Sequence, residues 1–109
     1  MQLAVQPWKA QSNADVEPCL SVIMPVYNEA RTVRQVIEVV LAQRPVQELI
    51  IVDDCSSDGS WEVLDEIAKA HDRIRLFRHE QNQGKGAALA TGIGHAKAPI
   101  VIIQDADME

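Results

Sequence analysis

The 109-residue sequence contains little of several residue types that mark other classes of protein. Its two cysteines, Cys19 and Cys55, form no CxxC pair and no zinc-like spacing with the three histidines. Neither a disulfide framework nor a zinc module is therefore expected, and a reduced, cytoplasmic environment is the default. No apolar run approaches the roughly 20 residues of a membrane helix. The polar start "MQLAVQPWKAQ" does not resemble a signal peptide.

Basic residues are also scarce, since ten Lys and Arg stand against sixteen Asp and Glu, for a net charge of -6. No run of basic residues and no basic–aromatic interleaving offsets this balance, so no nucleic-acid partner is expected. Because the chain is acidic overall, a site for a polyanionic ligand would need a local positive charge from a metal ion or a helix N-terminus. Apolar residues make up 47% of the chain, which is enough for the core of one small domain.

Residues 1–18 lack periodicity and are predicted to form a flexible N-terminal arm, whereas residues 19–109 show a regular alternation of segments. Four apolar segments are predicted strands: 20–25, 48–53, 73–77 and 100–104. The segments 20–25, 48–53 and 100–104 are continuous apolar runs, as in buried parallel strands. Segment 73–77, "RIRLF", instead alternates between polar and apolar residues, as an edge strand does.

The segments between these strands carry apolar residues at helical spacing. The first helix is predicted from Asn28 as its cap, and the second from Ser60 as its cap. The third is predicted to start near Gly86 and to bury four apolar residues: Leu89, Ala90, Ile93 and Ala96. Buried strands alternating with amphipathic helices indicate βαβ units, and hence a three-layer, Rossmann-like α/β domain with a parallel sheet.

Acidic residues follow the predicted strands, and in open parallel sheets ligands bind outside the carboxyl ends of the strands. The strongest signal is Asp105-Ala106-Asp107, because it follows a buried strand directly. Alternate residues there can aim two carboxylates at one ion, or one at the ion and one at a ligand hydroxyl. Hard divalent cations such as Mg²⁺ take one or two carboxylates together with substrate phosphates.

Three further segments reach the same edge. In "VDDCSSDGS", helix capping explains Ser57 to Ser60, and Asp53 or Asp54 is left to accept hydrogen bonds from a base or ribose. In "PVYNEA", Tyr27 and Glu29 either pack and favour a helix start, or face a nucleotide. In "NQGKGAA", Lys85 is either an exposed lysine or a cation that meets a phosphate. Cys55 is expected to be a packed side chain rather than a nucleophile.

Taken together, "SVIMPVYNEARTV", "ELIIVDDCSSDGS", "NQGKGAALATGI" and "IVIIQDADME" resemble the family 2 glycosyltransferases in order and spacing. Within that family they are most similar to the dolichyl-phosphate mannose synthase-like branch, which includes polyprenyl-phosphate sugar transferases of the cell envelope. The resemblance implies a GT-A fold, a nucleotide-diphospho-sugar donor, and an inverting transfer assisted by Mg²⁺ or Mn²⁺. It also implies a lipid-phosphate or glycan acceptor and a location in the cytoplasm or at the cytoplasmic face of a membrane.

The resemblance also carries residue roles. Pro25, Tyr27 and Glu29 match positions that line the nucleotide pocket, and Val52 and Asp54 match positions that contact the base and ribose. The remaining matches are those of the metal motif: Asp105 and Ala106 beside the donor, and Asp107, Glu109 and Asp105 as metal ligands. Glu109 stands where the mannose synthases often have Gln, and Cys55 stands where the family commonly has Gly.

Because a GT-A domain is roughly twice this long, the chain is interpreted as the N-terminal, donor-binding part of such an enzyme, ending just past the metal motif. That interpretation predicts little transferase activity for the chain alone and an uncovered sheet edge through which it can self-associate. Two alternatives remain, a non-catalytic nucleotide-binding or assembly module and a nucleotidyltransferase. "PVYNEA" lacks the glycine-rich basic loop of the latter, and it lacks the first-strand acids of a third candidate, a receiver-type domain.

Overall fold

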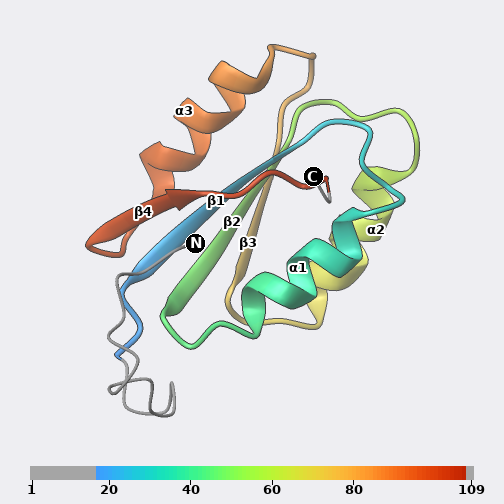
Figure 1. Ribbon diagram of the computed structural model, residues 1–109. Helices are drawn as coiled ribbons and strands as arrows, with labels where there is room; N and C mark the ends of the chain where they lie inside the picture. Colours follow the sequence, from blue (N-terminus) through green and yellow to red (C-terminus); the bar gives the residue numbers. More distant parts are fainter. Residues whose placement is uncertain (1–16, 108–109) are drawn as a thin grey trace.

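The computed structural model describes residues 17–107, which form four strands and three helices in alternation (Figure 1). The elements are β1 (Leu20–Val26), α1 (Val33–Leu41), β2 (Val46–Asp53), α2 (Ser60–Lys69), β3 (Ile74–Arg78), α3 (Lys85–His95) and β4 (Ile100–Ile103). Most of the predicted arm (residues 1–16) and the predicted metal ligand Glu109 lie outside the described residues. Within that range, no helix is both long and apolar enough to span a bilayer.

The strands form one parallel sheet in the order β3-β2-β1-β4. Helices α1 and α2 cover one face and α3 covers the other (Figure 1). The chain therefore runs outward from β1 through β2 to β3, and then crosses the opposite face to place β4 on the other side of β1. This arrangement confirms the predicted Rossmann-like α/β fold, and strand order reverses between β1 and β4.

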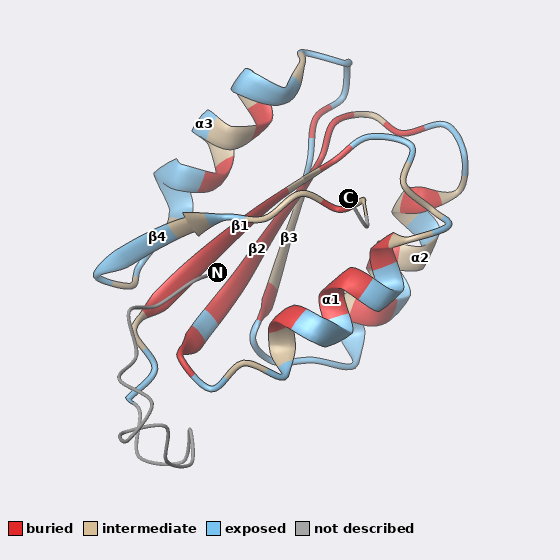
Figure 2. Cartoon of the chain, viewed as in Figure 1, coloured by how far each residue is buried: buried red, intermediate tan, exposed pale blue. Residues whose placement is uncertain are grey.

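The core lies on both faces of β1 and β2, whose residues are almost all buried (Figure 2). One cluster packs these strands against α1 and α2 and includes Met24, Ile37 and Leu64. A smaller cluster of Ile23, Ile50, Val52 and Ala88 packs them against α3. Continuous apolar strands are buried on both faces because helices cover both, as the sequence predicted.

The buried face of α3 differs from the prediction. Its fully buried residues are Ala88 and Gly92, while Leu89 and Ala96 are only partly buried and Ala90 and Ile93 are exposed. The prediction assigned the wrong face of the helix to the core: Ala88 and Gly92 face the sheet, and the helix approaches it so closely that only small residues fit between them. A Cβ atom on Gly92 would lie 2.4 Å from Cγ2 of Ile23.

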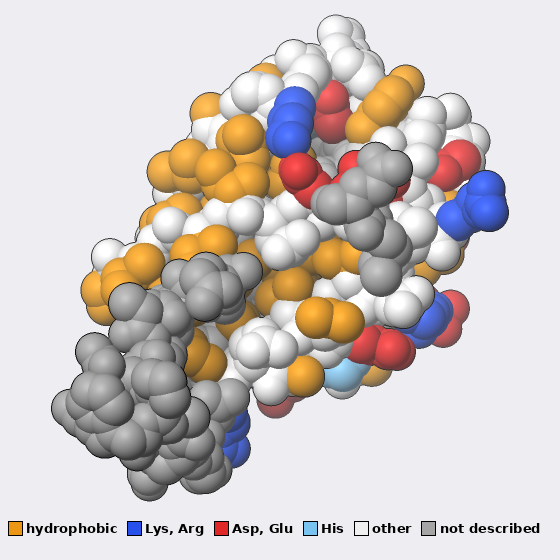
Figure 3. All heavy atoms as spheres, viewed as in Figure 1, with side chains coloured by type: hydrophobic (Ala, Val, Ile, Leu, Met, Phe, Trp, Pro, Cys, Tyr) orange, Lys and Arg blue, Asp and Glu red, His pale blue; other side chains and the backbone are white. Residues whose placement is uncertain are grey.

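Strand β4 was predicted to be a buried core strand, and this is wrong for its side chains. Ile100, Val101 and Ile103 are 41–51% exposed, because β4 is an edge strand that pairs with β1 alone in the described range. Figure 3 shows hydrophobic side chains spread over the part of the surface formed by β4 and α3. The prediction that "RIRLF" is an edge strand is confirmed, since β3 is the last strand on the other side of the sheet among residues 17–107.

The predicted helix caps are wrong at two places. Helix α2 begins at Ser60 itself, after Gly59 with φ 95°, and the carboxylate of Asp58 accepts the Ser60 N–H at 3.0 Å. Helix α1 begins at Val33, after Thr32, so Asn28 belongs to the preceding loop and adopts φ 54°. In both cases short polar side chains stabilise the loop between strand and helix instead of the first helical turn.

At the other end of the sheet, the buried carboxylate of Glu48 anchors the connection from α3 to β4. It accepts hydrogen bonds from the Ser21 hydroxyl, the Lys97 N–H at 2.7 Å and the Arg75 guanidinium at 3.1 Å. Ser21 in turn accepts the Ala98 N–H at 3.0 Å. Arg75 is only partly exposed because it pairs with Glu48. This network fixes where β4 enters the sheet.

Candidate nucleotide-sugar site

A cavity of about 340 Å³ opens at the carboxyl edge of the sheet, where strand order reverses. Residues at the ends of all four strands line it: Pro25 and Val26 at the end of β1 and Tyr27 and Glu29 after it, Asp54 after β2, Asn82, Gly84, Lys85 and Ala88 around the start of α3, and Asp105, Ala106 and Asp107 after β4. Figure 3 shows acidic side chains gathered with a basic one around this hollow. Eight of the residues predicted from the sequence therefore meet in one cavity.

The wall that follows β4 holds the two predicted metal-binding carboxylates. The strand ladder continues past β4, because the Gln104 N–H donates to the Ile23 carbonyl at 2.9 Å. Ala106 is then buried, and its carbonyl accepts the Thr32 hydroxyl at 2.8 Å. Anchoring Ala106 in the core leaves Asp105 and Asp107 on either side of it, partly exposed and lining the cavity.

The opposite wall carries a positive charge. Lys85 is the first residue of α3, and its ammonium lies 2.7 Å from Oδ1 of Asp105. This hydrogen bond, with the charges of Asp105 and Asp107, raises the pKa of Lys85 and so favours its protonated form. The N-terminus of α3 adds the partial positive charge of unpaired helical N–H groups, and its first turn contains no acidic residue.

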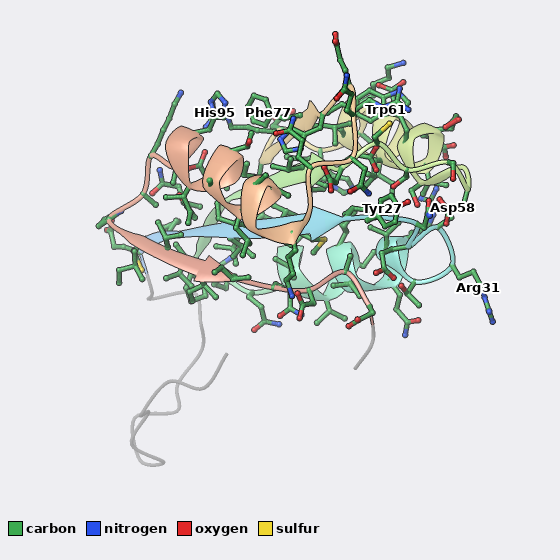
Figure 4. All side chains as sticks on the ribbon, turned by 90° about the horizontal axis from the view of Figure 1, so that it is seen from above. Tyr27, Arg31, Asp58, Trp61, Phe77 and His95 are labelled. Carbon is green, nitrogen blue, oxygen red and sulfur yellow. The ribbon has the colours of Figure 1, made fainter. Side chains whose placement is uncertain are left out.

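The loop after β1 is held by the loop after β2. The Asn28 N–H donates to the Ser56 hydroxyl at 2.9 Å, and the Asn28 side chain accepts the Ser57 N–H at 2.8 Å. The Glu29 N–H donates to the Ser60 hydroxyl at 2.9 Å. These bonds place Tyr27, which is 49% exposed, at the end of the molecule that also carries Asp58 (Figure 4).

The two neighbouring acids after β2 have different roles. Asp53 is fully buried and accepts the N–H and hydroxyl of Ser56, so its role is structural. Asp54 lines the cavity, but its carboxylate already accepts three hydrogen bonds, from His79 Nδ1 and from the N–H groups of Gln83 and Gly84, all at 2.8–2.9 Å. A carboxylate offers about four acceptor positions, so one remains for a ligand.

Two of the predicted site residues, Val52 and Pro25, lie within strands rather than in the loops that follow them. The side chain of Val52 is fully buried beneath α3 and does not line the cavity, so its predicted contact with the base stays a prediction. Pro25 lines the cavity from within β1, which continues to Val26. A proline is tolerated there because β4, the neighbour on that side, pairs with β1 only as far as Ile23.

Sequence reasoning did not find His79, Asn82 or Ala88. His79 has no predicted role in the sequence analysis, yet it is 8% exposed and contacts Asp54 directly. The available signal was its place, one residue beyond β3 at the same edge as the acids. Of the other histidines, His95 stacks on Phe77 with ring centroids 4.0 Å apart, on α3 and β3 respectively (Figure 4).

The backbone conformation of Cys55 is one that glycine favours, in agreement with the glycine that the family commonly has at this position. Cys55 adopts φ 64°, in the left-handed region that glycine enters without steric cost. Its thiol is partly buried and lies 3.4 Å from the carbonyl of Glu80, which agrees with a packed side chain.

The described residues fit a divalent cation that shares its coordination with a ligand. No group of three or more His, Cys, Asp or Glu side chains within 17–107 forms a complete metal site. Two carboxylates on one wall suit an ion of the Mg²⁺ type, which binds proteins through one or two carboxylates and takes its other oxygens from phosphates and water.

Three carboxyl groups predict how stability depends on pH. Burial alone would raise the pKa of Glu48, Asp54 and Asp58, but hydrogen bonds to each carboxylate outweigh it and lower the pKa below the ordinary values of 4.5 and 3.8. A lowered pKa means that the folded state favours the ionised form. The resulting stability is present above these values and is lost as pH falls through the folded-state pKa values.

We therefore expect the unfolding temperature to be nearly constant from pH 7 to about pH 5 and to fall steeply below about pH 4. Circular dichroism melts across this range measure it, and Asp54→Asn should show a shallower acid-side fall. An unfolding temperature that rises between pH 5 and pH 3 would contradict the assignment of these carboxylates as ionised.

Comparison with known proteins places these features in a family. Residues 21–109 match the sequence profile of "Glycosyl transferase family 2". The glycosyltransferase AglE of Haloferax volcanii is 33% identical over 93 residues, which cover 83% of this chain and 31% of that protein. The dolichyl-phosphate beta-glucosyltransferase ALG5C of Trichomonas vaginalis is 31% identical over 94 residues, covering 78% of this chain and 28% of that protein.

Solved structures of glycosyltransferases have the same fold as this chain. The mannosyltransferase PcManGT from Pyrobaculum calidifontis, solved with GDP-Man and Mn²⁺, superposes with a TM-score of 0.76 and 31% identity, over 94% of this chain and 31% of that one. Residues 1–349 of S. aureus TarS superpose with a TM-score of 0.73 at 24% identity, over 82% of this chain and 27% of that one, which supports the fold alone. The chain spans about a third of the length of the relatives it matches.

Proposed function

Because this chain belongs to glycosyltransferase family 2, we propose that its cavity binds the nucleotide-diphospho-sugar donor of an inverting, metal-assisted sugar transfer. The observation that carries the proposal is the meeting of two carboxylates, one lysine and a helix N-terminus in a single cavity at the switch point of the sheet. PcManGT, the structural neighbour solved with GDP-Man and Mn²⁺, supports the choice of ligand.

The roles divide between the two walls. Asp107 and Asp105 would hold Mg²⁺ or Mn²⁺, which supplies Lewis-acid stabilisation of the charge on the departing nucleoside diphosphate. Lys85 and the start of α3 offer the diphosphate positive charge from the other side. Tyr27, Pro25 and Glu29, which line the cavity, would contact the nucleoside, and Asp54 would use its remaining acceptor position for the ribose or base.

A divalent cation bound together with the donor diphosphate would account for the many acids at this edge. Repulsion between Asp105 and Asp107 is relieved by Lys85 in the free chain, and a divalent cation would relieve it more fully. The ion pair between Lys85 and Asp105 is more than 40% exposed at each side chain, so it is weak and readily exchanged. We expect Lys85 to move from Asp105 to a phosphate oxygen as the metal and donor enter.

The acceptor is proposed from the family resemblance as a polyprenyl phosphate or a glycan. A phosphate anion is already nucleophilic and needs little help from a base. Within residues 17–107 no strand covers the outer edge of β4, and Ile100, Val101 and Ile103 are partly exposed there, which supports the further proposal that the chain self-associates through this edge.

Calorimetric titration of the chain with GDP-mannose and UDP-N-acetylglucosamine, with and without Mn²⁺, tests the proposed function. Mn²⁺-dependent binding of at least one of the two is expected. Binding that is indifferent to metal would favour a non-catalytic nucleotide-binding module. Failure of both nucleotide sugars to bind under either condition would overturn the proposal.

A further inference from the structure

The buried imidazole of His79 joins three elements of the sheet edge at one point. It lies one residue beyond β3, and its backbone N–H donates to the Asp53 carbonyl at 2.9 Å. Its Nδ1 is 2.8 Å from Oδ1 of Asp54, after β2, and its Nε2 is 2.8 Å from the hydroxyl of Thr91, on α3. Both ring nitrogens therefore have a partner within the protein.

The charge on Asp54 decides which way these hydrogen bonds run. Burial raises the pKa of Asp54, but the bonds from Gln83, His79 and Gly84 outweigh it and keep the carboxylate ionised at neutral pH. An ionised carboxylate only accepts, so Nδ1 of His79 carries the proton and donates. Nε2 shares a hydrogen bond with the Thr91 hydroxyl, so the imidazole is oriented at both ends.

Asp54, held by His79, in turn binds backbone N–H groups in the wall of the cavity. Oδ1 accepts the Gln83 N–H at 2.9 Å and Oδ2 accepts the Gly84 N–H at 2.8 Å. Gly84, with φ 95°, is the residue from which α3 starts, so its placement sets the position of Lys85 and of the first helical turn. Asn82, Gly84 and Lys85 all line the cavity.

We propose that His79 is a positioning residue for the donor site: by holding Asp54 and Thr91, it fixes the segment 82–85 that presents Lys85 and the α3 N-terminus to the diphosphate. The proposal deepens the proposed function and rests on it. His79 itself does not line the donor cavity, so its effect on the ligand passes through Asp54 and the loop.

Three substitutions test the proposal on the 109-residue chain, with GDP and UDP in the presence of Mn²⁺ as probes. His79→Phe keeps a ring of similar size but removes both nitrogens. His79→Asn replaces Nδ1–H with an amide N–H that can still reach Asp54. His71→Phe is the matched control, because His71 is exposed near the amino edge of the sheet.

His79→Phe should weaken nucleotide affinity by on the order of 10-fold, as expected when one hydrogen bond to a charged group is lost. His79→Asn should recover most of that loss, and His71→Phe should have no effect. Hydrogen exchange adds a readout that general destabilisation would not reproduce: in His79→Phe, the Gln83 and Gly84 amides should exchange faster while amides of β1 and β2 keep their protection.

Unchanged affinity and unchanged exchange at Gln83 and Gly84 in a folded His79→Phe chain would overturn the inference. So would a His79→Asn variant as impaired as His79→Phe, or exchange that rises uniformly over the sheet. If the unmodified chain binds no nucleotide, the proposed function fails, and the exchange of these two amides still decides whether His79 holds the loop.

Discussion

Asp107→Asn is expected to abolish most of the metal dependence of donor binding, weakening Mn²⁺-dependent affinity for GDP or UDP by on the order of 100-fold. The substitution keeps the size of the side chain but removes the negative charge that a hard cation requires. Loss of a residue that merely supports a metal ligand costs roughly 10- to 100-fold, so loss of a ligand should lie at or above the top of that range.

The nucleotide affinity measured without Mn²⁺ distinguishes the loss of a metal ligand from general damage to the site. Without Mn²⁺, removing a negative charge beside the diphosphate should leave affinity unchanged or slightly improved. Asp105→Asn should cause a smaller loss, because the family resemblance places Asp105 beside the donor as well as at the metal, whereas it assigns Asp107 to the metal alone. Asp72→Asn, at an exposed turn near the amino edge of the sheet, serves as the matched control.

Isothermal titration of each variant with nucleotide, at saturating Mn²⁺ and in the presence of a chelator, measures these affinities. An Asp107→Asn chain that keeps the full difference between the two conditions would show that the cation, if bound, is held elsewhere.

Gly92→Ala is expected to destabilise the fold by about 2 kcal/mol, the usual cost of forcing an extra carbon into a packed core. The new Cβ would lie 2.4 Å from Cγ2 of Ile23 and 3.5 Å from a methyl of Val52. Both neighbours are fully buried in the centre of the sheet, so neither can move aside freely. Alanine is otherwise the better helix former, so the clash must outweigh a gain of roughly 1 kcal/mol.

Gly94 provides a matched control two residues along the same helix. Nothing lies within 4 Å of a Cβ built there, so Gly94→Ala should stabilise the fold by about 0.5–1 kcal/mol. Thermal unfolding should separate the two variants by roughly 10 °C or more, given about 4–8 °C for each kcal/mol in a domain of this size.

A double variant tests the contact itself. Replacing Ile23 with Ala removes the methyl group that the new Cβ would strike, so Gly92→Ala should cost much less in an Ile23→Ala background. Equal effects of Gly92→Ala and Gly94→Ala would mean that α3 can lift from the sheet without loss, which the buried contacts of Ala88 argue against.

The sequence by itself determined the alternation of elements, the parallel sheet and the family. Continuous apolar strands and helical spacing are local patterns, and parallel strands necessarily bring their carboxyl ends to one edge. Asp105, Asp107, Lys85 and Tyr27 could therefore be assigned to one site from their positions along the chain, and all four line the cavity.

Only the tertiary structure decided which side chains at that edge face the ligand and which hold the protein together. Asp53 and Asp54 are adjacent and chemically identical, yet one is fully buried against Ser56 and the other lines the cavity. The role of His79 was also decided by the tertiary structure, because its partners Asp54 and Thr91 are 25 and 12 residues away in the sequence. These roles depend on contacts between distant segments, which no local pattern encodes.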